Sequence, residues 1–416
     1  MRYRSRRKFA LLSMIMSLFG IPVAFILFAL TLLGVAIFHH HTLKVGLLGL
    51  ATITLYKLMF TSFEGVSGLP GLAGHMAEEW VVLSNLFGLL VGFALLADHF
   101  EKSHVPAWLP ALLPDDWRGP AMLLVMIFVM STFLDNIAAA IIGGTIAAAV
   151  FRKKVHIGYL AAIVAASNAG GAGSVVGDTT TTMMWIEGVS PLDVLHAFLP
   201  AVVALAVFSI PASLAQQKHS PIMRDAAPDL RIDWSRVTIV VLLLVAVICT
   251  NIFVNTRYAD LADRFPFLAV AVWVTLLVTA SWRAPNWKIV RPAALGSLFL
   301  LSLVTSASMM PVESLPLPSW QTTLGLGFVS AVFDNIPLTK LALEQGGYDW
   351  GALAFAVGFG GSMMWFGSSA GVALSTQFPQ AKSVFLWLRY GWTVPLAYLA
   401  GFAALLLLSG WHPAAA

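Results

Sequence analysis

The stretch SNAGGAGSVVGDTTTTMMW, residues 167–185, is the most informative part of the sequence for the architecture. It lies inside an apolar run, about residues 157–186, that is long enough to cross a bilayer, for which ~20 apolar residues suffice. Gly and Asp are poor residues for a helix interior. Because unpaired backbone groups are strongly unfavourable in lipid, an interrupted helix survives there only where it lines a polar cavity. The stretch therefore predicts a transmembrane helix that is broken near the middle of the membrane.

The second half of the chain repeats this pattern. Residues 170–179 and 360–369 both read Gly-Gly, five residues, Gly and then two side chains with oxygen, at an offset of 190 residues (360 minus 170). Upstream, FLDNIA at 133–138 resembles VFDNIP at 332–337, and the two Asp-Asn pairs are offset by 199 residues (334 minus 135). Each half thus carries an Asp-Asn segment followed by a glycine-interrupted helix. Such an arrangement predicts an inverted repeat whose breaks meet at an ion site.

Each Asp-Asn pair lies near the middle of a long apolar stretch, Gly119–Val150 in one half and Trp320–Gln345 in the other. Asp, Asn and Pro supply turn chemistry, so each stretch is predicted to be a re-entrant helical hairpin. One long tilted helix with a buried Asp is the alternative. The predicted fold class is an all-α polytopic membrane protein with two re-entrant hairpins and two broken transmembrane helices.

The composition of the 416-residue chain excludes several soluble classes of protein. Hydrophobic residues make up 59% and charged residues 11%, with a mean hydropathy of +0.84, whereas a soluble domain carries about 25% charged residues. A cytosolic enzyme, a disordered tail and a secreted disulfide scaffold are therefore excluded. The net charge of +4 comes from short basic clusters, which are typical of anchors beside a lipid bilayer rather than of a nucleic-acid-binding face. The single cysteine, Cys249, leaves no disulfide framework.

The distribution of apolar runs predicts a multi-pass protein of the cell (inner) membrane. Candidate spans lie near residues 10–38, 45–63, 80–97, 121–150, 157–186, 192–215, 237–256, 266–282, 289–310, 321–343, 350–375 and 383–409. The first follows the basic stretch Met1–Lys8 and is too long for a secretory signal, which predicts an uncleaved helix with a cytoplasmic N-terminus. The polar stretch 216–236 predicts a cytoplasmic linker between halves 1–215 and 237–416. The number of crossings before residue 120 stays open.

Three carboxylates lie at membrane depth: Asp135, Asp178 and Asp334. Each costs roughly 2.5–3.5 kcal/mol on insertion scales, so such residues usually have a function. We predict that they bind Na⁺ or protons directly. The alternative is that some of them are protonated, or paired as structural locks.

Neutral side chains beside the breaks supply the further oxygens that a hard cation such as Na⁺ requires. These candidate ligands are Asn136, Ser167, Asn168, Thr179, Thr180, Asn335, Ser368 and Ser369. Helix capping and hydrogen bonding between helices are the structural alternative for this set. Lys340, four residues before Glu344, predicts an ion pair at a hairpin base. It could instead compete with Na⁺ or attract an anionic substrate.

Several of these motifs resemble the signatures of NhaD-type sodium/proton antiporters. The resemblance is carried by residues 167–185, by FLDN at 133–136, by FDNIP at 333–337, by GGS at 360–362 with GSSAGV at 367–372, and by HMAEE at 75–79. It covers most of the chain. Two positions depart from the family pattern: Gly173–Val176 stands where Trp-Ser-Pro-Ile is more usual, and Lys340 stands where an apolar residue is expected.

The resemblance has implications for fold, assembly and site. The family belongs to the ion transporter superfamily, together with citrate and dicarboxylate carriers and arsenite pumps. It implies an elevator-type fold with a scaffold and a transport domain, and a homodimer. It also implies that Asp178, Thr179, Asp135 and Asp334 handle Na⁺ and H⁺, and that no cofactor is needed beyond the transported ions.

The motifs and the resemblance together predict a secondary active transporter, not an enzyme, that exchanges Na⁺ or Li⁺ for H⁺. Competition of metal ion and proton for one set of carboxylates gives exchange without a chemical step. The alternative is a Na⁺- or H⁺-coupled carrier of citrate or another dicarboxylate, held by half-helix N-termini and hydroxyl groups. An intramembrane hydrolase with paired aspartates is a third hypothesis. It is disfavoured because it does not explain the duplicated Asp-Asn and glycine motifs.

Overall fold

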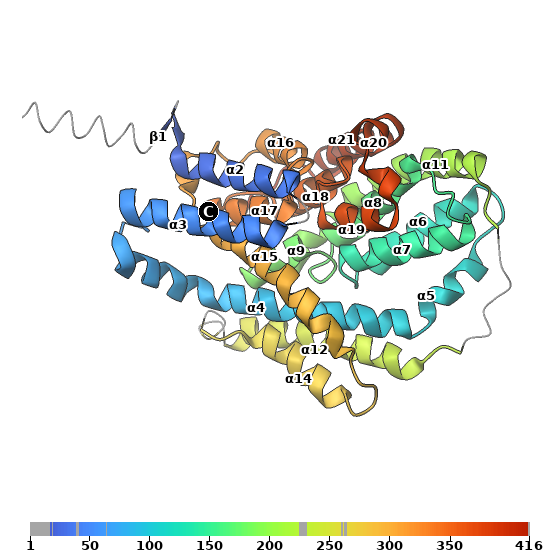
Figure 1. The fold of residues 1–416 in the computed structure, drawn as a ribbon, viewed down its shortest axis with the longest axis horizontal. Coiled ribbons are helices and arrows are strands. Elements are labelled where there is room, and N and C mark those ends of the chain that lie inside the picture. The colour runs from blue at the N-terminus through green and yellow to red at the C-terminus, as the bar shows by residue number, and fades with distance from the viewer. Residues whose placement is uncertain are drawn as a thin grey trace, which may run out of the picture.

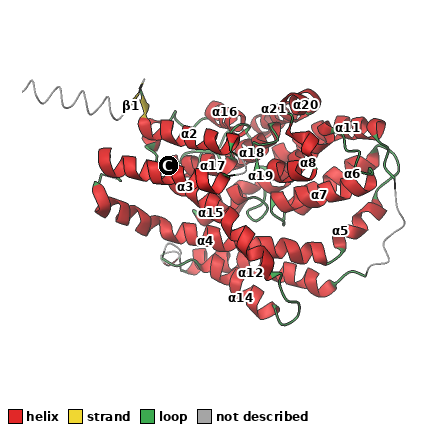
Figure 2. Ribbon diagram, viewed as in Figure 1, coloured by secondary structure: helices red, strands yellow, loops and turns green. Residues whose placement is uncertain are grey.

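The computed structural model describes residues 17–18, 20–38, 41–63, 65–223, 231–258, 261 and 264–414, so the basic stretch Met1–Lys8 lies outside it. Figure 2 shows that helices make up most of the described chain. Strands β1 (Ser17–Leu18) and β2 (Ile21–Pro22) form a small antiparallel ribbon. A turn at Gly20, with φ of +80°, precedes β2. All other named elements of the described chain are helices, in agreement with the predicted all-α fold class.

Five helical segments of the described chain are long and apolar enough to cross a membrane, or six if one pair bent by 56° is counted as a span. The helices of these segments are α3 (Thr42–Phe60), α4 (Gly68–Lys102), α10 (Pro191–Leu195) with α11 (Phe198–His219), α12 (Trp234–Arg257), η2 (Trp287–Ile289) with α15 (Val290–Ser308), and the bent pair α20 (Val384–Tyr390) and α21 (Thr393–Leu408). Large apolar side chains cover the outside, with Leu407 84% and Met59 73% exposed. Apolar surface of this kind indicates contact with lipid. The chain is a polytopic helical membrane protein.

The stretches around the two Asp-Asn pairs and the two glycine motifs form shorter helices. In the first half these are α6 (Arg118–Ser131), α7 (Asn136–Val150), α8 (Ile157–Ala172) and α9 (Thr179–Ile186). In the second half they are α16 (Trp320–Ser330), α17 (Asn335–Gln345), α18 (Trp350–Gly360), η4 (Gly361–Met363) and α19 (Ser369–Gln377). The remaining elements are α2 (Val23–Ile37), α5 (Val105–Trp108), η1 (Leu109–Leu112), α14 (Phe267–Thr279), η3 (Val312–Ser314) and η5 (Pro379–Lys382).

The interruptions at the Asp-Asn pairs have a local cause. The carboxylate of Asp135 accepts a hydrogen bond from the backbone N–H of Ile137 at 3.3 Å. The carboxylate of Asp334 accepts the equivalent bond from Ile336 at 3.1 Å. Asp is a preferred N-cap residue because it satisfies a free N–H of the first turn. Each Asp therefore starts a new helix, α7 or α17, at the predicted tip.

The Gly-Gly pairs let the backbones of neighbouring helices approach each other, and they lie at or just before the ends of their α-helices. Helix α18 ends at Gly360, directly before η4. Helix α8 continues through Gly170 to Ala172, and a Cβ atom on Gly170 would lie 2.1 Å from the carbonyl oxygen of Phe128 in α6. A Cβ atom on Gly360 would lie 2.2 Å from the carbonyl oxygen of Gly327 in α16. The interruption of the first helix follows at residues 173–178.

One further contact recurs in the two halves. The hydroxyl of Ser131 donates to the carbonyl oxygen of Ser167 at 2.6 Å, and the hydroxyl of Ser330 donates to that of Val357 at 2.6 Å. The donors are offset by 199 residues (330 minus 131) and the acceptors by 190 (357 minus 167). These are the offsets of the two sequence motifs. The two hydrogen bonds thus occupy corresponding positions relative to the two pairs of sequence motifs.

Figure 1 shows α4 running along one side of the short helices, with α12 and α14 on its outer side. Helix α15 packs against α3, α4 and α17, whereas α11 packs against α21 and α8 in the bundle of short helices. Helices therefore occupy both ends of the predicted linker 216–236, since α11 ends at His219 and α12 begins at Trp234, while residues 224–230 lie outside the described chain. The guanidinium of Arg283 bonds the carboxylate of Asp233, which caps α12, and thereby lowers the pKa of Asp233.

Candidate functional site

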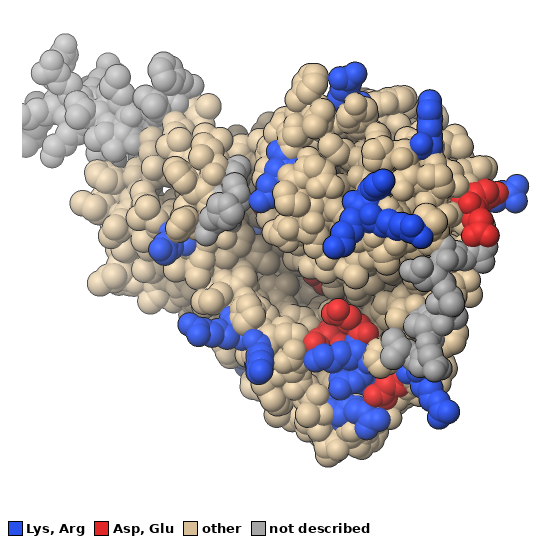
Figure 3. All heavy atoms as spheres, turned by 45° about the vertical axis from the view of Figure 1, so that its right-hand side comes forward, with Lys and Arg blue, Asp and Glu red and all other residues tan. Residues whose placement is uncertain are grey.

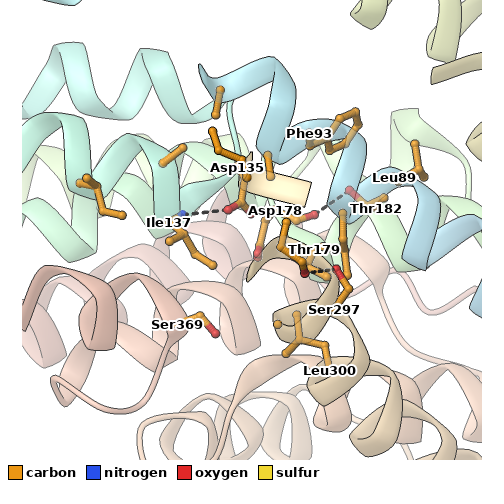
Figure 4. Close-up of a pocket in the computed structure, with 18 of the residues that line it drawn as sticks. Leu89, Phe93, Asp135, Ile137, Asp178, Thr179, Thr182, Ser297, Leu300 and Ser369 are labelled. Carbon is orange, nitrogen blue, oxygen red and sulfur yellow. Dashed lines mark hydrogen bonds between the residues drawn. The ribbon is translucent and has the colours of Figure 1, made fainter. Parts of the chain in front are cut away.

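A cavity of about 400 Å³ lies between α4, α7, α9 and α15. One face of α4 forms a wall of it, because Leu89, Phe93 and Glu101 are separated by multiples of four residues. With ~1.5 Å per helical residue, this wall extends for about 18 Å. Figure 4 shows Asp135 and Asp178 next to each other among the lining side chains, with Ser369 below them in that view. The space-filling view in Figure 3 shows a groove in the surface of the molecule, with acidic side chains at its edge.

The charged side chains that line this cavity are all acidic. They are Asp98, Glu101, Asp135 and Asp178, and no Lys or Arg of the described chain is among the lining residues. Asp98 is neutralised in part by Lys102, which lies at 2.8 Å. Carboxylates in a partly enclosed space attract cations and repel anions. The cavity therefore favours a cation as its ligand.

The carboxylate of Asp178 accepts hydrogen bonds from two side chains. Its Oδ1 accepts a hydrogen bond from Asn136 Nδ2 at 3.0 Å, and its Oδ2 accepts one from the hydroxyl of Thr180. The side chain makes no cap bond to α9, and the residue is 2% exposed. Asp135 and Asp334, by contrast, serve as helix caps, for which a structural role is sufficient. Asp178 is therefore the strongest candidate for an ion ligand.

Asn168 connects the carboxylate site of the first half to the second half. Its Oδ1 accepts a hydrogen bond from Asn136 Nδ2 at 3.0 Å. Its Nδ2 donates to the hydroxyls of Ser362 at 2.9 Å and Ser368 at 3.1 Å. Ser362 was not predicted as a site residue, although it is the third residue of the Gly360-Gly361-Ser362 motif. A hydroxyl directly after the glycine pair was the available signal.

The two halves differ at the centre of this network. Asn335 is 3% exposed, and its Nδ2 has no hydrogen-bond partner within the described ranges. Asn136 is its equivalent at the 199-residue offset, and the two partners of Asn136 in the first half, Asn168 and Asp178, correspond at the 190-residue offset to Gly358 and Ser368. The second half thus lacks the amide oxygen and the carboxylate. A Cβ atom on Gly358 would lie 3.3 Å from Asp178 Oδ2, so this glycine leaves space beside that carboxylate.

The remaining predicted site residues include Thr179, Ser369, Asp334 and Ser167. Thr179 lines the cavity, as does Ser369, whose hydroxyl donates to Asp334 Oδ2 at 3.2 Å. Asp334 itself is not among the lining residues of the described chain. The hydroxyl of Ser167 donates to the carbonyl oxygen of Val164 at 2.9 Å, so it serves its own helix. No group of three or more His, Cys, Asp or Glu side chains is placed to hold a metal ion in the described ranges, and an ion at Asp178 would draw on neutral oxygens.

Removal of the Thr180 hydroxyl should weaken cation binding at Asp178. In the Thr180→Val variant Asp178 loses a hydrogen bond, and bonds to charged groups contribute about 1.5–3 kcal/mol. Since 1.4 kcal/mol corresponds to about tenfold in affinity, we expect the apparent Km for Na⁺ to rise about tenfold in a vesicle flux assay. Thr238→Val is the matched control, because that exposed hydroxyl bonds only the backbone of α12. An unchanged Km in Thr180→Val would contradict the assigned role.

Comparison with known proteins supports the resemblance that the motifs predict. No protein-family model matches the chain. The chain is 27% identical over 340 residues to sodium/proton antiporter 1 of Arabidopsis thaliana, an alignment that covers 71% of this chain and 57% of that protein. It is 28% identical to sodium/proton antiporter 2 of the same plant, over 69% of this chain and 76% of that protein. It is 26% identical to the Na⁺/H⁺ antiporter NhaD of Alkalimonas amylolytica, over 68% of each.

Among solved structures, the YdaH transporter of Alcanivorax borkumensis shares 14% sequence identity with this chain, and the match covers 89% of this chain and 97% of that one with a TM-score of 0.39. The sequence relatives confirm that the chain is similar to NhaD-type antiporters. The chain spans less than two thirds of the length of the first of the plant relatives.

Proposed function

We propose that this chain, as a relative of the NhaD-type sodium/proton antiporters, exchanges Na⁺ or Li⁺ for H⁺ across the membrane, with Asp178 at the centre of the ion site. The observation that carries the proposal is a cavity whose charged lining residues in the described chain are all carboxylates and include the buried Asp178. Asn136 and Thr180 orient that carboxylate. Thr179, Asn168 and Ser368 supply the neutral oxygens nearby.

A carboxylate substrate fits this site poorly. An anion would need free N–H groups at the half-helix N-termini, which carry partial positive charge. Three of the four N-termini are already occupied by their own caps: Asp135 accepts from Ile137, Asp334 from Ile336, and Ser368 from Gly371. Citrate would also meet the negative charge of Asp135 and Asp178. Transport of a dicarboxylate is therefore the less favoured function.

Exchange follows from competition for one site. In this proposal the carboxylates bind either the metal ion or protons, and each ion is released when the other binds. Interacting carboxylates titrate as a set, so Asp135 and Asp178 are treated together. Since protons leave the site as the pH rises, Na⁺ binds more readily, and transport activity should increase with pH.

The repeat, the re-entrant hairpins and the elevator motion belong to this proposal. The recurrence of the Ser131–Ser167 bond as Ser330–Val357 supports two equivalent halves. The caps at Asp135 and Asp334 are consistent with hairpin tips. In the proposed mechanism, the short helices move as a transport unit against a scaffold that includes α4 and α15. The inner-membrane location, the cytoplasmic N-terminus, the division at 216–236 and the homodimer remain predictions.

A flux assay tests the proposed function. Purified protein in liposomes with an acidic lumen and an internal pH dye would receive Na⁺, Li⁺, K⁺ or citrate from outside. We expect alkalinisation of the lumen with Na⁺ and Li⁺ and little response to K⁺, with larger responses at higher external pH. Citrate uptake without any Na⁺-dependent change of internal pH would overturn the assignment and favour the dicarboxylate carrier.

A further inference from the structure

Lys340 is a buried cation that contacts three carboxylates. Its side chain is 2% exposed, and its ammonium group lies 3.0 Å from Glu79 Oε1, 2.6 Å from Glu187 Oε1 and 2.8 Å from Glu344 Oε1. The predicted ion pair with Glu344 is therefore present, but it is one of three. The other two partners are 261 and 153 residues away along the chain.

The three carboxylates belong to three different helices. Glu344 lies on α17 with Lys340 itself, Glu187 is the C-cap of α9, and Glu79 lies on α4. Helix α9 begins directly after Asp178, and α17 begins directly after Asp334. Lys340 thus joins the distal parts of the two half-helices whose N-termini carry the candidate ion ligands. Through Glu79 it also joins them to the helix that forms a wall of the cavity.

A buried cluster with this charge is an unfavourable way to stabilise a fold. One Lys and three Glu leave a formal excess of two negative charges. Glu79 is buried, with only 8% of its surface exposed, and its Oε2 has no hydrogen-bond partner in the described structure. Glu187 and Glu344 keep contact with water, with side chains 24% and 31% exposed. Apolar residues in place of a buried ion pair are often as stable or more stable, whereas a buried pair specifies one arrangement of its helices. The contacts at Lys340 therefore indicate control of geometry.

We propose that Lys340 is a positioning residue for the ion site, which acts by holding α9 and α17 in one orientation against α4. The inference rests on the proposed function, because it concerns the geometry of the same site. Loss of the ammonium frees α9 at Glu187 and α4 at Glu79, so Asp178 no longer stands at a defined place in the cavity. Lys340 does not contact the transported ion in this proposal.

The experiment separates positioning from stability. In Lys340→Met, we expect the melting temperature to fall, because Glu79 is left buried without its cation, and the apparent Km for Na⁺ to rise about 10-fold, the lower end of the range for outer partners of metal sites. The double variant Lys340→Met/Glu79→Leu should recover the melting temperature but keep the raised Km. Arg283→Gln removes the surface pair with Asp233 and should change neither. Recovery of both the melting temperature and the Km in the double variant would overturn the proposal.

A second measurement does not depend on transport. Cys249 is exposed, so a Cys249→Ser background allows one cysteine to be placed at Ala94, which lines the cavity on α4. We expect alkylation of this cysteine by a maleimide to be several-fold faster with Lys340→Met and with the double variant, but not with Arg283→Gln. Unchanged alkylation in both Lys340 variants would overturn the positioning role. Absence of Na⁺/H⁺ exchange in the wild-type chain would overturn the proposed function alone, since the alkylation rates would still report on the geometry.

Discussion

The Asp178→Asn variant is expected to lose Na⁺/H⁺ exchange, with an apparent affinity for Na⁺ reduced by about 100-fold or more. A pair of opposite charges about 4 Å apart at an effective dielectric of about 20 interacts by about 4 kcal/mol. The substitution removes this attraction, and each 1.4 kcal/mol corresponds to about tenfold in affinity. Asn retains the shape of the side chain, and Asn136 and Thr180 remain beside it, so the fold should be preserved. The measurement is Na⁺-dependent alkalinisation of proteoliposomes over a range of Na⁺ concentrations.

A matched control makes this result specific. Asp116 is a surface carboxylate, with a side chain 54% exposed and paired with Arg118. Asp116→Asn should therefore show wild-type exchange and wild-type stability in the same assay. Exchange that persists at the wild-type Na⁺ affinity in Asp178→Asn would remove Asp178 from the mechanism and leave Asp135 as the acidic ligand to be tested next.

The Gly170→Ala variant is expected to disrupt the packing of α6 against α8. The new Cβ atom would lie 2.1 Å from the carbonyl oxygen of Phe128 and 2.8 Å from its carbonyl carbon. This neighbour is helix backbone and cannot rotate away, so α6 and α8 must separate. Overpacking of a core typically lowers the free energy of unfolding by about 1–3 kcal/mol, and occasionally by more. We expect a clear fall in the melting temperature in detergent and loss of exchange.

Gly325→Ala provides the comparison for this effect. Gly325 also lies within a helix, α16, but a Cβ atom there would meet nothing within 4 Å. Ala has a higher helix propensity than Gly by up to ~1 kcal/mol, so this variant should be as stable as the wild type or slightly more stable. Equal melting temperatures for Gly170→Ala and Gly325→Ala would show that α6 and α8 are not in the close contact described.

Local chemistry explains which features could be predicted from sequence. The helix starts at Asn136 and Asn335 follow from the Asp residues before them, which cap the first turn wherever the chain lies. The carboxylate of Asp178 could be identified because burial of such a group in an apolar run requires a reason. Local sequence does not specify the structural role of the Gly170-Gly171 pair, since Gly permits both a helix break and a close approach of backbones. Only the neighbouring carbonyl oxygen of Phe128 distinguishes the two.

Composition and nearest neighbours along the chain specify the class of protein, the positions of the helix interruptions and the acidic character of the site. The partners of these groups are known only from the folded chain: Ser362 for Asn168, Glu79 and Glu187 for Lys340, and α15 as a wall of the cavity. The folded chain also reveals the difference between Asn136 and Asn335, which share the local sequence Asp-Asn-Ile but not the same surroundings. The physical reason is that packing joins groups far apart in the chain, and no local preference specifies which of them will meet.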